Sequence, residues 1–132
     1  MNIKEVSNSH NISSDTLRYW ERAGAIPPVS RDRNGHRDYD AEDLNWVHFT
    51  KCMRDIGVSI ERIIEYISLF KQGDSTIPMR KELLIDQRDE LAEKLRVLNS
   101  NYEMLNRKID TYDEHMLSYE WKLRAYEKEG QK

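Results

Sequence analysis

The feature that most constrains the fold is a heptad pattern of apolar residues in the C-terminal half of the chain. After Pro78 there is no glycine or proline until Gly130, so nothing in this stretch forces a helix to end. Leucine or tyrosine recurs every seven residues from Leu84 to Tyr119, and an apolar residue follows four positions later, except at Arg88. Held over five heptads, this spacing predicts a left-handed coiled coil. The predicted dimer-interface residues are Leu84, Leu91, Leu95, Leu98, Tyr102, Leu105, Ile109, Tyr112 and Met116.

The partner of this long helix is expected to be a second copy of the chain in an antiparallel pair. The alternative is a single helix folded back on its own N-terminal domain, but that domain is too small to cover so long an apolar seam. A mean hydropathy of −0.87 and 34% charged residues fit a small core joined to a long solvated helix. We therefore expect an N-terminal head at 1–75, a dimerisation helix at 76–127 and a flexible tail at 128–132.

Two short helices joined by a tight turn open the chain. Ile3 to Ser9 has a weak amphipathic pattern, and Asn11 tolerates the left-handed conformation that a tight turn requires. Ser13 is a good N-cap for a second helix, which should end at Gly24. Two short helices with a turn of this length predict a helix-turn-helix.

A wing is predicted directly after it. Asn34–Gly35 stands between short extended runs, which favours a β-hairpin closed by a type I′ turn with positive φ at both positions. Arg31, Arg33 and Arg37 decorate this hairpin. The fold class predicted is mainly α: a winged helix-turn-helix head with a small β-hairpin wing, then a long antiparallel coiled-coil dimerisation helix.

Two further helices should close the core of the head. Asp40 caps the third and Ser59 the fourth. Spacing on the third helix predicts a buried face of Trp46, Phe49, Met53 and Ile56. On the fourth helix the predicted buried residues are Ile60, Ile63, Ile64, Ile67 and Phe70.

The charge of the head is unusual for a nucleic-acid-binding protein. Residues 1–76 hold ten Lys and Arg against twelve Asp and Glu, a net charge of −2, whereas such proteins are usually basic. Positive charge is nevertheless concentrated between Ser14 and Arg37, where five arginines and no lysine occur. Any contact with DNA must therefore be a narrow, arginine-lined face.

These segments resemble, in order, the MerR family of bacterial transcription regulators. The resemblance rests on the string from Thr16 to Gly24, on Pro28, on the run from Arg31 to Tyr39 and on the junction from Met53 to Glu61. It is greatest with the AdhR/NmlR-like branch, through Cys52–Met53–Arg54, Glu65–Tyr66, Gln72–Gly73, Arg80–Lys81–Glu82–Leu83–Leu84 and Gln87–Arg88. That branch is associated with thiol-based sensing of reactive aldehydes and other electrophiles.

The resemblance implies how DNA would be read. The first turn of the second helix would face base edges in the major groove, while nearby residues hold phosphates. Tyr39 is equally a candidate for the core, and Leu17 and Trp20 are expected to be core. The predicted DNA-binding residues are Ser14, Asp15, Thr16, Arg18, Tyr19, Arg22, Arg31, Arg33, Asn34, Gly35, His36, Arg37 and Tyr39.

A homodimer of this kind would sit on promoter DNA between the −35 and −10 elements, with RNA polymerase as its partner. Its activated state would bend and undertwist that DNA, and an effector would shift the dimer toward the distorting state. The single cysteine, Cys52, excludes an intramolecular disulfide and fits a reducing cytoplasm. The family resemblance implies a bacterial cytoplasmic protein that is associated with the nucleoid. No apolar run is long enough for a membrane span.

Cys52 is the predicted sensor thiol, expected on the inward-leaning side of the third helix. The residues alone favour an inert thiol that fills space, whereas the family resemblance favours the sensor. A metal effector or cofactor is not expected, because the four histidines are scattered, and no constellation suggests an enzyme. Two alternatives remain: a coiled-coil adaptor protein, and a non-covalent ligand pocket that uses Tyr102, Tyr112, Tyr119 and Trp121.

Overall fold

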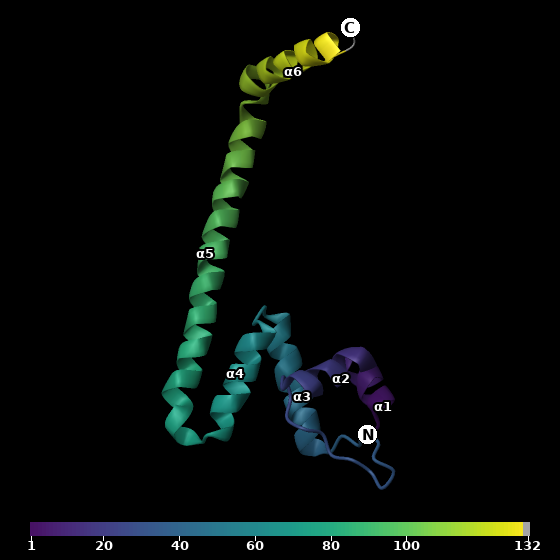
Figure 1. The fold of residues 1–132 in the computed structure, drawn as a ribbon. Helices are drawn as coiled ribbons and strands as arrows, with labels where there is room; N and C mark the ends of the chain where they lie inside the picture. Colours follow the sequence, from purple (N-terminus) through teal and green to yellow (C-terminus); the bar gives the residue numbers. More distant parts are fainter. Residues whose placement is uncertain (131–132) are drawn as a thin grey trace. The chain divides into compact units, whose positions relative to one another are not determined.

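The computed structural model describes the backbone of residues 1–130 and the side chains of residues 1–124. Within that range the fold is mainly helical, as predicted (Figure 1). The elements are α1 (Ile3–His10), α2 (Ser14–Ala23), α3 (Ala41–Asp55), α4 (Ile60–Lys71), the 3-10 turn η1 (Asp74–Thr76), α5 (Ile77–Asp110), the π-helical turn η2 (Tyr112–Met116) and α6 (Leu117–Gly130).

The chain divides into two compact units, Met1–Gln87 and a second that begins at Arg88. The boundary lies inside α5, so the first turns of that helix belong to the N-terminal unit. Of the tail predicted at 128–132, residues 131 and 132 lie outside the described residues. The tail and the other two segments proposed from the sequence remain predictions.

Side-chain caps define the beginnings of α1 to α4. Each cap accepts a hydrogen bond from the backbone N–H three residues later, which satisfies one of the donors that a helix leaves unpaired at its start. Asn11 (φ 55°) and Gly24 (φ 86°) are left-handed and end α1 and α2, which confirms the predicted turn. The four caps are Asn2, Ser13, Asp40 and Ser59.

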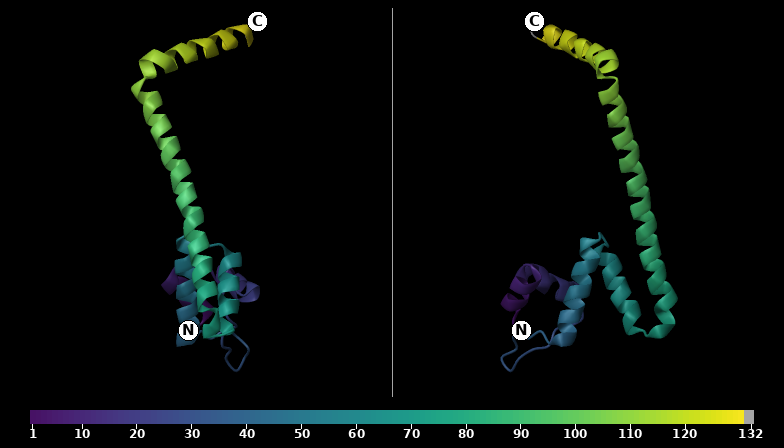
Figure 2. Two further views of the ribbon diagram at one scale, coloured as in Figure 1. Left: turned by 90° about the vertical axis from the view of Figure 1, so that its left-hand side faces the viewer. Right: turned by 180° about the vertical axis from the view of Figure 1, so that it is seen from behind.

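The core of the first unit lies among α1 to α4 and the segment that joins α2 to α3. α1 and α2 pack on each other, and α4 lies between α3 and the first turns of α5 (Figure 2). Leu17 and Trp20 hold the inner face of α2, as predicted. The buried apolar residues are Val6, Ile12, Leu17, Trp20, Ala25, Ile26, Val29, Tyr39, Val47, Val58, Ile63 and Ile67.

The buried face predicted for α3 is partly wrong. Its fully buried residues are Val47 and Thr50, and the Thr50 hydroxyl donates to the Ala25 carbonyl at 2.7 Å. Trp46, Phe49 and Met53 are only partly buried. Ile56 is 63% exposed because α3 ends at Asp55 and Ile56 is already its C-cap. The deepest part of the buried face is therefore at Val47 and Thr50, and the predicted residues lie along its border.

On α4 the prediction holds for the isoleucines but not for Phe70. Ile63 and Ile67 are buried, and Ile60 and Ile64 pack against the core. Phe70 is exposed, and its ring meets the Trp46 ring edge to face, with centroids 5.1 Å apart. Phe70 thus belongs to an aromatic surface cluster and not to the core.

The wing is a loop without strands among the described residues. A single antiparallel bridge joins Arg31 and Arg37, so the predicted β-hairpin is not seen. The type I′ turn is also wrong, because only Gly35 has a positive φ (80°). The Asp32 carboxylate accepts the N–H groups of Asn34 and His36 at 2.9 and 3.0 Å, and Gly35 N–H donates to the Asp32 carbonyl. These bonds close a three-residue turn with the left-handed position at its last residue.

The first turns of α5 are tied to the corner between α3 and α4. The Gln87 amide donates to the Gly57 carbonyl at 3.2 Å and accepts from Arg62 Nη1 at 2.7 Å. One side chain thereby joins three elements of the first unit. This bonding explains why the compact unit extends into α5.

The second unit carries the end of α5, then η2 and α6. Thr111 departs from helical geometry (φ −107°) and is followed by the π-helical turn. The heptad pattern from Leu84 to Tyr119 is therefore not carried by one continuous helix. Because a π turn inserts an extra residue, the residues beyond it no longer continue the stripe of α5.

Candidate nucleic-acid interface and thiol site

The first turn of α2 points its polar side chains outward. Leu17 and Trp20 hold the opposite face in the core. Ser13 accepts the Thr16 N–H at 3.1 Å and donates its hydroxyl hydrogen to Thr16 Oγ1 at 2.8 Å. The Asp15 side chain is 98% exposed. This turn thus presents one exposed carboxylate and a fixed pair of hydroxyls beside the N-terminus of the helix.

Further along α2, the predicted phosphate-holding residues lie on its surface. Arg18 forms an ion pair with Asp15, Nη1 to Oδ1 at 3.0 Å. The Arg22 guanidinium lies 5.6 Å from the centre of the Tyr19 ring, a cation–π distance. Arg18, Tyr19 and Arg22 are all exposed, so the helix offers all three to a ligand.

Glu21 is the centre of the polar contacts between α2 and the wing loop. Its carboxylate accepts the Val29 N–H at 2.7 Å, Arg37 Nε at 2.6 Å and Arg31 Nη2 at 3.4 Å. Burial alone would raise the pKa of Glu21, but the hydrogen bonds and the positive charges of Arg37 and Arg31 together lower it. The carboxylate is therefore held in its charged form.

A groove of about 450 Å³ lies where α2 meets the wing loop and the start of α1. Arg18, Arg31 and Arg37 line it together with Gly35 and His36. The structure thus brings five of the predicted DNA-binding residues to one depression. The others lie elsewhere: the first turn and the Tyr19–Arg22 pair of α2 lie outside this lining, as do the exposed Arg33 and Asn34.

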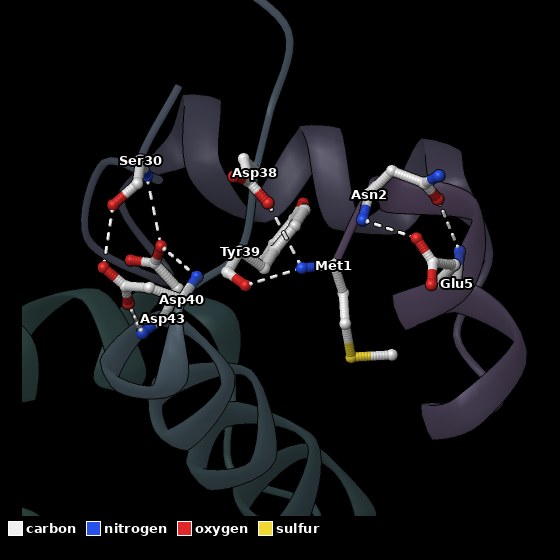
Figure 3. A network of polar contacts seen from close by, with 8 residues as sticks. All are labelled: Met1, Asn2, Glu5, Ser30, Asp38, Tyr39, Asp40 and Asp43. Atoms are coloured by element: carbon white, nitrogen blue, oxygen red, sulfur yellow. Dashed lines mark hydrogen bonds and ion pairs between the residues drawn. The ribbon is translucent and has the colours of Figure 1, made fainter. Parts of the chain in front are cut away.

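Both ends of the wing loop are anchored (Figure 3). Asp38 N–H donates to the Ser30 carbonyl at 2.8 Å. Ser30 in turn donates its hydroxyl to Asp40 at 2.9 Å and its N–H to Asp43 at 3.1 Å. Tyr39 N–H donates to the Met1 carbonyl at 2.7 Å. The loop is therefore fixed at its base.

Tyr39 is placed in the core rather than on the surface. Its side chain is 2% exposed, and its hydroxyl has no hydrogen-bond partner among the described residues. Burial raises the pKa of the phenol. Of the two roles considered for this residue, the packing favours the core.

Cys52 is exposed on α3, which corrects the expected inward position. The buried positions of α3 are Val47 and Thr50, and a residue two places after Thr50 points about 200° around the helix from it. The two basic residues near Cys52 in sequence have other partners. Lys51 pairs with Asp55 at 3.5 Å, and Arg54 donates to the Val58 carbonyl at 2.9 Å.

The neighbour of the thiol is His48, which the sequence pattern did not single out. His48 Nε2 lies 3.6 Å from Cys52 Sγ, within hydrogen-bonding range for sulfur. The spacing could have indicated it, since residues four apart on a helix face each other. A thiol beside an imidazole is an arrangement in which a proton can pass from sulfur to nitrogen.

Comparison with known proteins decides the family. The profile described as "MerR HTH family regulatory protein" matches residues 1–69, and the profile described as "MerR, DNA binding" matches residues 44–108. The chain belongs to the MerR family of DNA-binding transcription regulators. The predicted family is confirmed, and its members are regulators rather than enzymes.

Similar proteins support the AdhR/NmlR-like branch of the MerR family. The chain is 52% identical to the HTH-type transcriptional regulator AdhR of Bacillus subtilis over 93 residues, which are 70% of this chain and 66% of AdhR. The match thus spans just under two thirds of AdhR. The crystal structure of a MerR family transcriptional regulator from Listeria monocytogenes aligns over 98% of both chains, with a TM-score of 0.74 and 43% identity. HiNmlR, described as lacking the sensor domain and bound to promoter DNA, aligns over 88% of this chain and 92% of its own at 26% identity and a TM-score of 0.67.

The seam of α5, which the heptad pattern assigns to dimerisation, is open in the single chain. The predicted seam residues of α5 are all exposed: Leu84, Leu91, Leu95, Leu98, Tyr102, Leu105 and Ile109. Of the two predicted seam residues in η2, Tyr112 is exposed and Met116 is partly buried. A contiguous exposed apolar stripe on a helix is typical of a surface that another chain covers.

A second groove, of about 580 Å³, lies at η2. It is lined by Met104, Arg107, Lys108, Thr111, His115, Met116 and Tyr119. Of the four aromatic residues considered for a ligand pocket, only Tyr119 is among them. Tyr112 instead donates its hydroxyl to Glu120 at 2.7 Å, a bond that raises the pKa of Tyr112.

Two other classes of site have no candidate in the part of the chain whose side chains are described. There, no three His, Cys, Asp or Glu side chains come together as a metal site. No helix in the described range combines the length and the apolarity that crossing a bilayer requires.

Proposed function

We propose that this MerR family regulator is a homodimer that reads promoter DNA with α2 and the wing loop and responds to reactive aldehydes or related electrophiles at Cys52. One observation carries the sensing part: the only thiol of the chain is exposed and lies 3.6 Å from the imidazole of His48. The resemblance to the AdhR/NmlR-like branch supplies the chemical class.

DNA reading is supported by the charges around α2. Asp15 and its neighbours in the first turn would face base edges, and Arg18 with the wing arginines would hold phosphates beside the groove that they line. Dimerisation through the α5 seam would place two such surfaces on an inverted repeat. A head with a net charge of −2 would gain from this doubling, because the phosphate contacts of two heads add.

The proposed reaction at Cys52 needs no oxidant and no leaving group. The sulfur forms a bond to the carbonyl carbon of the aldehyde, and the electron pair of the C=O π bond moves to oxygen. The thiol proton passes to His48 Nε2 and ends on that oxygen, which gives a hemithioacetal. The thiolate is the reactive form of cysteine, so a neighbour that accepts the proton should speed the step.

The added group would act on DNA through α3. Cys52 lies one turn before the corner at Gly57, whose carbonyl accepts the Gln87 amide of α5. A bulky group at this end of α3 would shift the dimer between states that hold the promoter differently, with RNA polymerase bound to the distorted form. Distorting DNA in this way costs on the order of 1–6 kcal/mol.

The test combines mass spectrometry with transcription from a promoter that the protein binds. Wild-type protein treated with formaldehyde or methylglyoxal should gain the mass of the adduct at Cys52 and should change transcription. Cys52→Ala should do neither, while Lys51→Ala, a neighbouring change on α3, should behave as wild type. Normal induction of Cys52→Ala would refute thiol sensing and would favour a ligand in the groove at η2.

The role of His48 is tested separately by the rate of modification. His48→Ala should slow the reaction of Cys52 with methylglyoxal relative to Lys51→Ala. Equal rates in the two variants would show that the imidazole takes no part.

A further inference from the structure

Glu21 is placed where a carboxylate is costly unless it is paired. Its side chain is 10% exposed, and a charge removed from water to this degree needs several hydrogen bonds to be tolerated. It lies on α2 between Arg18 and Arg22. The residue is thus part of the helix that is proposed to enter the DNA, but it does not face outward with its neighbours.

The three donors that satisfy Glu21 all come from the segment after α2. Val29, whose N–H is one donor, lies at the start of the wing loop. Arg31 and Arg37 are the two residues that the single antiparallel β-bridge of that loop joins in the described chain. The shortest contact is Arg37 Nε to Oε1, at 2.6 Å. One carboxylate therefore fixes the position of the start of the loop and the positions of the guanidinium groups on both of its sides.

This arrangement has two consequences for the charge seen by DNA. The guanidinium groups of Arg31 and Arg37 are held in one geometry before DNA arrives, so less ordering is needed on binding. Part of their positive charge is also cancelled by Glu21, which weakens the attraction of the head for any phosphate backbone irrespective of sequence. The first effect favours DNA of one shape, and the second disfavours all other DNA.

We propose that Glu21 is a specificity-determining residue of this regulator: it positions Arg31 and Arg37 for phosphates of one backbone geometry and withholds their charge from DNA of other shapes. The inference rests on the proposed reading of DNA by α2 and the wing loop. Glu21 acts through the two arginines and does not itself touch DNA.

The experiment compares Glu21→Gln with Glu65→Gln, which removes the same charge from an exposed position on α4. Wild-type protein first selects a duplex from a pool of random sequence. Affinities are then measured over a range of salt for that duplex and for one of the same composition in shuffled order. Glutamine can still accept the Val29 N–H, so the variant tests the charge rather than the backbone contact.

Glu21→Gln should bind the shuffled duplex more tightly than Glu65→Gln does, with a salt dependence steeper by about 0.9 for each arginine that gains a phosphate. It should bind the selected duplex no better than wild type. The preference for the selected duplex should fall about tenfold, the equivalent of about 1.4 kcal/mol. Glu65→Gln should change both affinities by a similar factor and leave the preference unchanged.

An unchanged preference in Glu21→Gln overturns the inference, and so does an equal loss of affinity for both duplexes together with a lower Tm, which would show a purely structural role. If Glu21→Gln is unfolded at the assay temperature, Arg37→Gln tests the same idea and should lose preference without binding the shuffled duplex more tightly. Failure of the wild-type protein to select any duplex would overturn both this inference and the proposed reading of DNA.

Discussion

Tyr39→Phe offers a direct test of the packing in the head. The Tyr39 hydroxyl is buried and has no partner among the described residues, and a buried polar group left unpaired costs about 1–3 kcal/mol. Removing the hydroxyl while keeping the ring should therefore raise the free energy of unfolding by up to that amount. For a unit of 87 residues, Met1–Gln87, each kcal/mol corresponds to about 4–8 °C in Tm.

The pH dependence of stability provides a second test of the same hydroxyl. Burial raises the pKa of Tyr39 above its ordinary value of 10.0. A group whose folded pKa is raised contributes stability that is fully present below its unfolded pKa and is lost as pH rises through the folded pKa. Thermal unfolding should therefore show the gap between Tyr39→Phe and wild type widening above about pH 10, because the variant cannot ionise there.

The control is Tyr19→Phe. Tyr19 is exposed, so this substitution should leave the Tm unchanged. A lower Tm for Tyr39→Phe would mean that the hydroxyl makes a stabilising bond, and the reasoning would fail. DNA affinity should also be unchanged in Tyr39→Phe. A several-fold loss of affinity without a change in Tm would instead assign the hydroxyl to DNA.

Three further predictions concern the surface of α2, the start of α3 and the seam. Arg18→Ala should weaken binding to all sequences and lower the salt slope by about 0.9 for each phosphate that is no longer bound; a changed base preference at an unchanged slope would contradict this. A hydrogen bond from the Asp43 N–H is the main cause that lowers the pKa of Asp40, so its stabilisation is present above its unfolded pKa and is lost as pH falls. Asp40→Asn keeps a good cap and should leave the free energy of unfolding near neutral pH unchanged. In urea titrations at lower pH, the variant should lose less of that free energy than wild type does. Leu98→Glu should convert the proposed dimer to a monomer in sedimentation, whereas Val97→Glu, beside the seam, should not.

Local signals in the sequence were sufficient to predict the caps and left-handed residues at which several helices begin or end. The caps at Ser13, Asp40 and Ser59 and the left-handed positions at Asn11 and Gly24 depend on hydrogen bonds and backbone preferences within a few residues. Such features need no knowledge of the rest of the chain. They were therefore predicted correctly without it.

The face of α3 could not be obtained in this way. Val47 and Thr50 are its fully buried residues, and Trp46 and Met53 pack against the same core while only partly buried. Counting from Trp46 follows the border of this face and leads to Ile56, which is exposed. Which residues of the face are buried most deeply depends on tertiary packing, and so does the outward position of Cys52.

The candidate site was predictable in its composition but not in its organisation. The concentration of arginines indicated the surface that is proposed to bind DNA, and the family resemblance indicated Cys52 as the proposed sensor. Glu21 gave no signal of its own, because its three partners lie 8 to 16 residues away. The predicted two-residue turn at Asn34–Gly35 was shorter than the observed three-residue turn. The Asp32 carboxylate accepts two N–H groups there, and the dipeptide alone does not reveal these bonds.

The exposure of Cys52 bears on how such a regulator can evolve. A side chain outside the core cluster fills no space there, so its replacement leaves no cavity and costs the fold little. A lineage can therefore lose the thiol, or gain one, while its DNA-reading surface stays intact. Under the proposed function, the chemical input and the genes under control can then change independently, and one scaffold can be redirected to a new signal by mutation at the surface of a single helix.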